Sequence, residues 1–501
     1  RILRNQGVRS SLLHSHKYND DAATGDEMAA IAGMAFTDIN NLTIAMGGTG
    51  TEKVGIDSSA DLTGADLQTV TVTGEGAFDL NGNTITGNAT STTSNVTLDA
   101  TGVSGIVTMA LDATANGVES IQTGSGADAI TIGAAAASGN AQSVTTNGGN
   151  DVLNIGAAVN FTFDGGAGVD TVSFAAATDM SAKSMTLTSV EQIQLIGGGG
   201  TQTINASFIS GKSFILKDDA STSNLTINMD QAVVDVSSLG MDSSIVDGTD
   251  AITINASGLG LVTTITGSAT SDTITGSGAA DTITGNGGQD TIVGGAGNDT
   301  ISGGAAVDSI KGEAGDDVLT GGAGADVFIL GAGEDTITDF VVGAANDDIH
   351  LDLSEVEAVS TMDLTMLDDF VSVTDAMAVA ATTITGATDL SGATANSQLL
   401  IVNGNITGTT SAALESALSV ALETGGDFAL KIAGTLAASD GFLCMYDNGT
   451  NSYLATVEST AGVANDAKPA ANDLVVNNIA VFTGIADCTT ILAAQFADIV
   501  A

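Results

Sequence analysis

Between Gly267 and Thr338 the chain repeats a pattern of polar and apolar residues with a fixed period of nine. Each unit opens with a Gly-rich turn, such as GGAGND (294–299), and continues into an alternating polar–apolar stretch. The eighth position is always large and apolar: Ile274, Ile283, Ile292, Ile301, Ile310, Leu319, Phe328 and Ile337. Period-two alternation predicts a short strand that buries one face. Because one unit cannot bury its apolar residue alone, the units are predicted to stack into a solenoid.

The sixth position of the same units is always aspartate: Asp272, Asp281, Asp290, Asp299, Asp308, Asp317, Asp326 and Asp335. Stacking would bring neighbouring carboxylates to within ~4.8 Å, the spacing of adjacent strands. At an effective dielectric constant near 20, two such charges repel each other by roughly 3 to 4 kcal/mol. The ladder therefore requires cations between the turns. Carboxylate and carbonyl oxygens are hard ligands, which favour Ca²⁺ over transition metals.

The units resemble the RTX family, the haemolysin-type calcium-binding repeats with the pattern G-G-x-G-x-D-x-U-x. The match is closest in GGAGND (294–299) and GGAGAD (321–326), and it departs from the pattern at Ser268, Thr270, Ala306, Glu313 and Leu330. The resemblance implies a parallel β-roll with two nonapeptides per turn and several bound Ca²⁺ ions. Two aspartate ladders would result: Asp272, Asp290, Asp308, Asp326 and Asp281, Asp299, Asp317, Asp335. It also implies calcium ligation by turn carbonyls, which we place at Gly294, Gly295, Gly297, Gly321, Gly322 and Gly324.

Residues 45–266 consist of short Thr/Val/Ile stretches separated by Gly/Asn/Asp turns, such as LQTVTVTG (67–74). No helix-length apolar period interrupts them, so an irregular parallel β-solenoid is the simplest prediction, with a β-sandwich as the alternative. Three RTX-like turns lie inside this region and end in Asp128, Asp151 and Asp170. We predict that they bind calcium and that this region and the repeats form one continuous stack.

The first 44 residues differ in character. DEMAAIAGMAFTDIN (26–40) predicts a short amphipathic helix with Met28, Ile31, Ala35 and Ile39 on one side. Four of the eleven basic residues of the chain precede it: Arg1, Arg4, Arg9 and Lys17. This segment is where the chain could meet an anionic surface such as lipopolysaccharide, although a solvated terminus explains the bases equally well.

Residues 355–501 mix helix and strand. SAALESALSVALET (411–424) predicts a helix from the spacing of its leucines, and Asn448-Gly449 predicts a hairpin turn. FLCMYDNGTNSYL (442–454) resembles the C-terminal modules of type I-secreted RTX proteins, and TTILAAQFADIVA (489–501) resembles their export signal. The two cysteines, Cys444 and Cys488, leave a buried thiol and a disulfide both open. DFVVGAANDDIHLDLSEVE (339–357) resembles a segment that closes RTX blocks, which puts the end of the roll near Ser354.

The predicted fold is therefore all-β: a parallel β-solenoid and RTX β-roll, with a short helical N-terminal segment and a mixed, mainly β C-terminal module. The predicted divisions are a basic N-terminal segment (1–44), an irregular solenoid (45–266), the calcium-binding roll with its cap (267–354) and a C-terminal module carrying the export signal (355–501).

The net charge of the chain limits the classes of function that it could have. A formal net charge of −48, from 59 acidic and 11 basic residues, would strain a compact metal-free chain, and multivalent cations would relieve that strain. Nucleic acid is a poor partner because phosphate binding depends on Lys and Arg. The hydrophobic content of 43% argues against a disordered acidic tail. No apolar run reaches the ~18 residues of a membrane span.

Motifs for catalysis are missing from the sequence. H-E-x-x-H, G-x-S-x-G and the phosphate-binding loop motif are all absent. The few Lys and Arg residues after Lys17 do not cluster with Tyr or His, as a polysaccharide-cleaving groove would require. We therefore expect no enzymatic activity.

Many RTX proteins of this Ala/Thr/Gly/Asp-rich, Cys- and His-poor kind are surface-layer (S-layer) proteins of Gram-negative bacteria. The resemblance implies a secreted cell-surface protein that folds with calcium and assembles with copies of itself into a lattice. An RTX adhesin, or another extracellular matrix or filament subunit, is the alternative. An enzyme with an unrecognised site is the third possibility.

Overall fold

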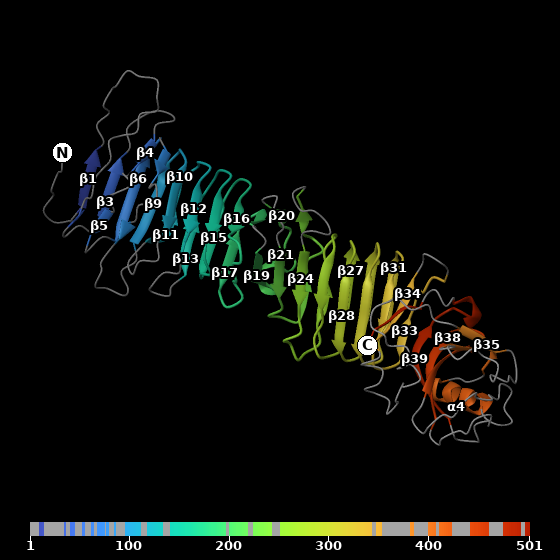
Figure 1. Ribbon diagram of the computed structural model, residues 1–501. Helices are drawn as coiled ribbons and strands as arrows, with labels where there is room; N and C mark the ends of the chain where they lie inside the picture. The colour runs from blue at the N-terminus through green and yellow to red at the C-terminus, as the bar shows by residue number, and fades with distance from the viewer. Residues whose placement is uncertain are drawn as a thin grey trace. The chain divides into compact units, whose positions relative to one another are not determined.

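A computed structural model of the protein describes residues 10–14, 35–36, 41–45, 53–55, 62–64, 68–75, 77–79, 85–86, 96–111, 118–133, 141–196, 200–218, 224–242, 251–342, 347–352, 381–384, 399–406, 410–422, 441–459, 474–491 and 496–500. The chain divides into two compact units. Unit 1 comprises Arg1–Asn228 and Ser238–Ile252, and unit 2 comprises Met229–Ser237 and Thr253–Ala501. Strands dominate both units (Figure 1).

Unit 1 is built mainly from two long parallel sheets whose strands alternate along the chain. The first contains, in spatial order, β1 (Ser10–His14), β3 (Asn41–Ala45), β6 (Thr69–Gly74), β9 (Val96–Val103), β11 (Val118–Gln122), β13 (Gln142–Thr145), β15 (Phe161–Asp164) and β17 (Met185–Thr188). The second runs through β4 (Lys53–Gly55), β7 (Ala77–Asp79), β10 (Val107–Leu111), β12 (Ala129–Ile132), β14 (Val152–Ile155), β16 (Thr171–Phe174), β18 (Gln192–Leu195), β20 (Ile215–Asp218) and β23 (Gly240–Met241).

Short elements complete unit 1. They are the small sheet of β2 (Ala35–Phe36), β5 (Leu62–Gly64) and β8 (Ile85–Thr86), the parallel pair β19 (Thr201–Asn205) and β21 (Asn224–Asn228), and the helix α1 (Ala206–Ile209). Strands of the two long sheets alternate in sequence, so each coil contributes one strand to each sheet. The inward side chains are apolar, as in β15, where Phe161 and Phe163 are buried while Thr162 is only partly so. This is the predicted solenoid, and its parallel pairing excludes the β-sandwich.

The nonapeptide repeats form the matching pair of sheets in unit 2. One contains β22 (Val233–Asp235), β25 (Thr264–Thr266), β27 (Thr282–Gly287), β29 (Thr300–Ala305), β31 (Val318–Ala323) and β33 (Asp335–Ile337). The other contains β26 (Asp272–Thr275), β28 (Thr291–Ala296), β30 (Ser309–Ala314), β32 (Val327–Leu330) and β34 (Asp348–Asp352). The boundary between the units falls within β24 (Ala251–Asn255). Two nonapeptides therefore make one coil, as the RTX resemblance implies.

The eighth-position residues form the core between these two sheets. All eight are at most 1% exposed. Parallel pairing aligns them in two columns, Ile274–Ile292–Ile310–Phe328 and Ile283–Ile301–Leu319–Ile337. Phe340 closes the core, with its ring centroid 6.1 Å from that of Phe328 and 5.1 Å from that of Phe482.

The sheets of the repeats continue into strands from the C-terminal part of the chain. β33 pairs in parallel with β39 (Leu474–Phe482), and β34 pairs in parallel with β40 (Phe496–Val500). Beyond β39, the order is β38 (Ser452–Ser459), β37 (Gly441–Asp447), β36 (Leu399–Asn405) and β35 (Ala381–Ile384). The predicted end of the roll near Ser354 is therefore not an end of the sheets, because segments distant in sequence extend both of them.

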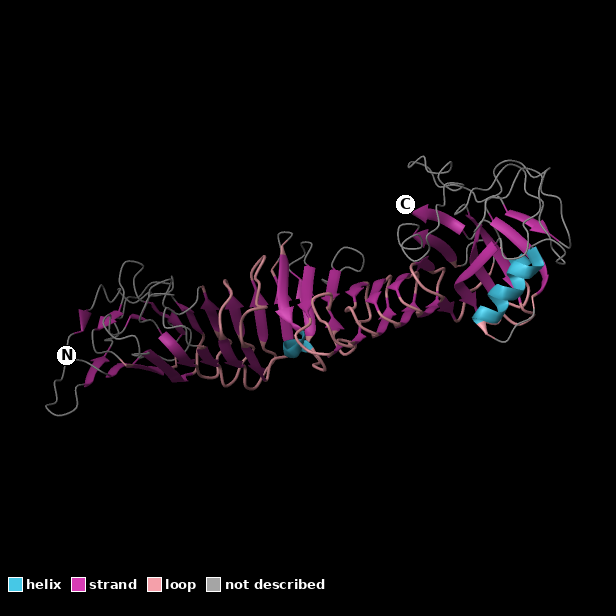
Figure 2. Ribbon diagram, turned by 90° about the horizontal axis from the view of Figure 1, so that it is seen from below, coloured by secondary structure: helices cyan, strands magenta, loops and turns pink. Residues whose placement is uncertain are grey.

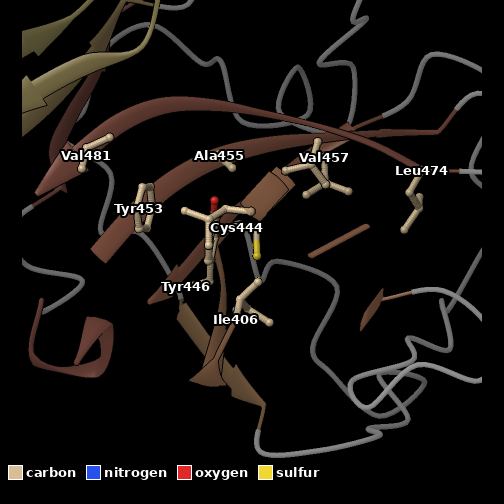
Figure 3. Close-up of a cluster of buried hydrophobic side chains, with 10 residues drawn as sticks. Ile406, Cys444, Tyr446, Tyr453, Ala455, Val457, Leu474 and Val481 are labelled. Carbon is tan, nitrogen blue, oxygen red and sulfur yellow. The ribbon is translucent and has the colours of Figure 1, made fainter. Parts of the chain in front are cut away.

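The helix α4 (Ser411–Leu422) packs on this C-terminal sheet (Figure 2). Leu414 on α4 is buried with Ile406, Tyr446 and Val476, while Ser419 Oγ donates to the Leu474 carbonyl (Figure 3 shows the buried cluster). The short 3₁₀ helix η2 (Cys488–Thr490) follows β39. The predicted helix at 411–424 and the predicted 448–449 hairpin are both confirmed. Cys444 and Cys488 are buried free thiols, so the two are not joined in a disulfide.

The amphipathic helix predicted over residues 26–40 is wrong at the two positions that the structure describes. Ala35 and Phe36, placed in an amphipathic helix, form β2 and pair in parallel with Thr63 and Gly64 of β5. A partner strand distant in sequence overrides the local helical spacing. The other predicted helix positions, Met28, Ile31 and Ile39, and the basic residues Arg1, Arg4, Arg9 and Lys17 lie outside the described residues.

Candidate metal centre

The sixth-position aspartates form two continuous ladders in unit 2. In each ladder the backbone N–H of one aspartate donates to Oδ1 of the aspartate 18 residues later. The first ladder has N–Oδ1 distances of 2.8, 2.9 and 2.9 Å from Asp272 through Asp290 and Asp308 to Asp326. The second has distances of 2.7, 2.7 and 3.2 Å from Asp281 through Asp299 and Asp317 to Asp335. All eight side chains are at most 3% exposed. The two predicted ladders are therefore present.

The other carboxylate oxygen has a different environment. Oδ2 of Asp299, Asp308, Asp317 and Asp335 is buried and has no hydrogen-bond partner among the described residues. A backbone carbonyl oxygen lies close by. A Cβ added to Gly294, for example, would overlap Asp299 Oδ2 and lie 2.9 Å from the Gly312 carbonyl oxygen in the next coil. Since both oxygens are acceptors, neither can satisfy the other, and the pair is suited to a cation.

Unit 1 contains a shorter ladder of the same design. Val107 N donates to Asp128 Oδ1 at 2.7 Å, Asp128 N to Asp151 Oδ1 at 2.7 Å, and Asp151 N to Asp170 Oδ1 at 2.8 Å. Oδ2 of Asp151 and of Asp170 is buried without a hydrogen-bond partner among the described residues. The three upstream aspartates chosen from sequence therefore occupy ladder positions.

Two acidic residues that the sequence analysis did not select end ladders, one in unit 2 and one in unit 1. Asp347 Oδ1 accepts from Asp326 N at 3.0 Å, and its Oδ2 accepts from Val341 N at 2.7 Å. Glu191 Oε2 accepts from Asp170 N at 2.9 Å in unit 1. Asp347 follows Asp326 by 21 residues instead of 18, so it falls out of phase. The Asp-Asp pair in NDDIH (346–350) was the available signal.

Burial raises the pKa of the ladder carboxyl groups. It is the main reason that the pKa of Asp299 is about 7, that of Asp308 and of Asp317 about 6, and that of Asp335 about 8. Neighbouring aspartates raise the pKa further, Asp317 and Asp281 in the case of Asp299. The pKa of Asp151 in unit 1 is raised to about 6, again mainly by burial. Such groups resist ionisation unless a positive charge is supplied.

The six glycines expected to supply carbonyl ligands all lie in the turns beside these carboxylates. Gly294 and Gly321 leave no space for a Cβ next to Asp299 and Asp326. Gly295, Gly297 and Gly322 have φ angles of 115°, 114° and 105°, which side chains rarely tolerate. A Cβ on Gly324 would overlap the Ala306 carbonyl oxygen. The glycines therefore permit close stacking of the turns.

The residues present fit calcium. No three His, Cys, Asp or Glu side chains converge on one point in the described ranges. An ion would therefore take single carboxylate oxygens from the ladders, at Asp299, Asp308 and Asp317 among others, and further oxygens from turn carbonyls. An all-oxygen set of this kind is typical of Ca²⁺. The ion would supply the positive charge that lets the buried carboxyl groups ionise.

Comparison with protein families agrees with this geometry. The family model for the RTX calcium-binding nonapeptide repeat, in four copies, matches residues 266–301 and again residues 302–337. These residues are RTX calcium-binding repeats. The search of curated proteins found no match to the chain. The RTX repeats thus coincide with the strands β26 to β33, which carry both ladders in unit 2.

Two departures from the RTX pattern occur where the backbone favours glycine. Ala306 and Glu313 have φ angles of 87° and 69°, and both stand where the RTX pattern has Gly. A non-glycine residue in the left-handed region costs about 1 kcal/mol or more. These residues are therefore sources of local strain in the RTX turns.

We expect Ala306→Gly to stabilise the calcium-bound protein by about 1 kcal/mol, because it relieves this strain. The matched control is Ala305→Gly, since Ala305 is equally exposed but does not have positive φ. It should destabilise the protein by about 0.5 to 1 kcal/mol. Denaturant unfolding in the presence of calcium measures both changes. Equal effects from the two substitutions would contradict the assignment of strain to Ala306.

Proposed function

We propose that this protein is a calcium-folded structural protein of the bacterial cell surface, which assembles with copies of itself into an S-layer lattice. The observation that carries the proposal is the pair of buried aspartate ladders, in which Oδ2 of Asp299, Asp308 and Asp317 lacks a hydrogen-bond partner among the described residues. RTX calcium-binding repeats in a β-solenoid indicate an extracellular calcium-binding protein. The lattice, the cell-surface location and type I secretion are the finer parts of the proposal.

Calcium concentration would decide when the chain folds. Extracellular calcium modules bind with dissociation constants of about 10⁻⁴ to 10⁻³ M, well above the free calcium of a cytosol. Before export the carboxyl groups would lack their counter-ions, and the chain, with a net charge of −48, would repel itself. Outside the cell, calcium would bind and the coils would stack, because binding to the folded state alone stabilises that state.

Calcium would also permit assembly. Copies with a net charge of −48 repel one another at neutral pH. Acidic side chains remain at the surface of the RTX turns, among them Asp316, which is exposed and accepts from Glu334 N at 3.0 Å. Calcium shared between such surfaces of neighbouring copies would hold a lattice together. We assign no catalytic activity to the chain. Among the described residues no helix is long and apolar enough to cross a membrane.

The test is to add calcium to the purified metal-free protein and to image it by negative staining. The proposal predicts ordered sheets in calcium and none in an equal concentration of magnesium. Magnesium is the matched control because it screens charge similarly but demands a smaller, octahedral site. Folding without ordered assembly at any protein concentration would contradict the lattice.

A secreted adhesin is the second candidate, favoured by one surface. Thr264, Thr282 and Thr300 lie side by side on β25, β27 and β29, and all three are exposed. A flat row of uncharged hydroxyl groups suits attachment to a foreign surface. An adhesin would remain monomeric in calcium and would bind such a surface, whereas the lattice protein would bind chiefly to itself.

A further inference from the structure

The eight RTX repeats are not equivalent in how their aspartates are held. In the second repeat, Asp281 Oδ1 accepts from Thr263 N at 2.6 Å, and Oδ2 accepts from Ser277 N at 2.6 Å. The Ser277 hydroxyl adds a contact of 3.0 Å to Oδ1. Both oxygens of this carboxylate are therefore occupied by donors from the chain itself.

The first repeat has a similar arrangement, in which the Ser268 hydroxyl is 3.2 Å from Asp272 Oδ1. Asp272 Oδ2 accepts from Ser268 N at 2.7 Å and from the Ser268 hydroxyl at 3.1 Å. The fourth, fifth and sixth repeats differ, since Oδ2 of Asp299, Asp308 and Asp317 has no partner among the described residues. Burial does not explain the contrast, because all five side chains are at most 3% exposed.

Among these five repeats, the contrast follows the backbone at the second position. This position is Gly295, Gly304 and Glu313 in the fourth, fifth and sixth repeats, with φ angles of 115°, 125° and 69°. Ser268 and Ser277 occupy it in the first two repeats, and neither has positive φ. Rotating this peptide exchanges an N–H directed at the carboxylate for a carbonyl oxygen. The serine repeats therefore present a donor where the fourth, fifth and sixth repeats do not. The eighth repeat departs from this pattern, since Gly331 does not have positive φ although Asp335 Oδ2 lacks a hydrogen-bond partner among the described residues.

The upstream ladder in unit 1 follows the same rule. Gly166, at the equivalent position before Asp170, has a φ of 86°, and Asp170 Oδ2 has no hydrogen-bond partner among the described residues. Gly124, at the equivalent position before Asp128, does not have positive φ. There Asp128 Oδ2 accepts from the Thr123 hydroxyl. A separate stretch of sequence with irregular spacing thus shows the same two states.

We infer that calcium binds at the turns whose carboxylate Oδ2 receives no hydrogen bond from the chain, and that Asp128, Asp272 and Asp281 are structural rungs on which Ser or Thr donors replace the ion. The inference rests on the proposed calcium-dependent function and refines it. A carboxylate whose two oxygens already accept N–H or O–H groups gains little from an ion, which would have to displace those donors. A backbone N–H pointing into the site also repels a cation.

The structural rungs Asp272 and Asp281 should let the first coil of the RTX array form without calcium. Ser268 and Ser277 satisfy the first member of each ladder in unit 2, where no earlier RTX coil lies beneath it. The next member, Asp290 or Asp299, then accepts an N–H from that rung. We therefore expect the coil of the first two repeats to retain local order at calcium concentrations that empty the later turns.

The test compares two aspartates of the same ladder in the full-length protein. Asp299→Asn should lower the number of bound calcium ions by at least one, whereas Asp281→Asn should leave it unchanged. Equilibrium dialysis at neutral pH with metal analysis measures the number, and circular dichroism in calcium checks that each variant folds. If Asp281→Asn removes as many ions as Asp299→Asn, the inference is wrong. If the unaltered protein binds no calcium, the proposed function itself fails.

A second variant tests whether the serine donor excludes calcium, and it leaves every aspartate unchanged. Ser277→Gly removes the hydroxyl donor and lets the backbone adopt positive φ, so it should add a calcium ion or strengthen binding of the weakest ion. Ser271→Gly is the matched control, because Ser271 lies in the same coil and its hydroxyl accepts from Gln289 N. It should leave binding unchanged. No gain in calcium binding for Ser277→Gly over this control would overturn the role assigned to the serine.

Discussion

The metal-free protein should keep the β-structure of its RTX array at pH 5 and lose it as the pH rises to 8. Folded-state pKa values are about 6 for Asp308 and Asp317, about 7 for Asp299 and about 8 for Asp335, against an ordinary value of 3.8. The folded state therefore holds more protons than the unfolded state between pH 4 and 8. Stability from these groups is complete below the unfolded pKa and is lost as the pH rises through the folded pKa values.

Far-UV circular dichroism in a chelator, followed from pH 5 to pH 8, measures this transition. One pKa unit corresponds to about 1.4 kcal/mol, so the combined effect of several carboxyl groups is comparable with the usual stability of a domain. Calcium-loaded protein is the control and should keep its signal at pH 8, where the ion replaces the protons. A metal-free signal that is constant or rises with pH would contradict the burial of these carboxyl groups without counter-ions.

Asp299→Asn should have opposite effects on stability with and without calcium. Asn can keep an oxygen acceptor for Asp281 N, which donates to Asp299 Oδ1 at 2.7 Å. Without calcium the substitution removes a buried charge whose pKa is about 7, so the metal-free variant should keep its β-structure to a higher pH than the unaltered protein. In saturating calcium it removes a ligand oxygen and should destabilise the fold by a few kcal/mol.

Circular dichroism of the variant in chelator from pH 5 to pH 8 measures the first effect, and denaturant unfolding in calcium measures the second. Asp316→Asn is the matched control for net charge, since Asp316 is exposed and its Oδ1 accepts from Glu334 N. Its free energy of unfolding in calcium should change by no more than about 0.5 kcal/mol, as is usual for surface positions, and its metal-free transition should move less than that of Asp299→Asn. Destabilisation of Asp299→Asn in both conditions would show that Asp299 is held by the protein alone and binds no ion.

Strict periodicity made the central part of the fold predictable. A period of nine with an apolar eighth residue places Ile292 and Ile301 in the core, and the same phase places Asp290 and Asp299 in two ladders. Repeats are easier to predict from sequence because each coil has the same local environment as its neighbour, so the local pattern also indicates the tertiary contacts.

The features that the sequence did not predict lie where the local pattern does not determine the tertiary contact. The pairing of β39 with β33 joins Ala480 to Asp335 across more than a hundred residues, and an alternating pattern does not specify which sheet edge a strand meets. Ala35 and Phe36 form a strand through such a distant partner. Some ladder aspartates accept a hydrogen bond at Oδ2 and others do not, and this difference accompanies the sign of φ at residues such as Ser277 and Gly295. The sequence indicates it only where a serine stands in place of glycine.

Hydrogen exchange during a calcium titration measures whether the RTX strands fold only when calcium is bound. Metal-free protein at pH 7.5 is titrated with calcium, and amide exchange is followed by mass spectrometry in peptides spanning β28 to β31. A calcium-dependent fold predicts fast exchange throughout these strands without calcium and strong protection at millimolar calcium, with little protection from an equal concentration of magnesium. Full protection of β28 to β31 before any calcium is added would contradict it.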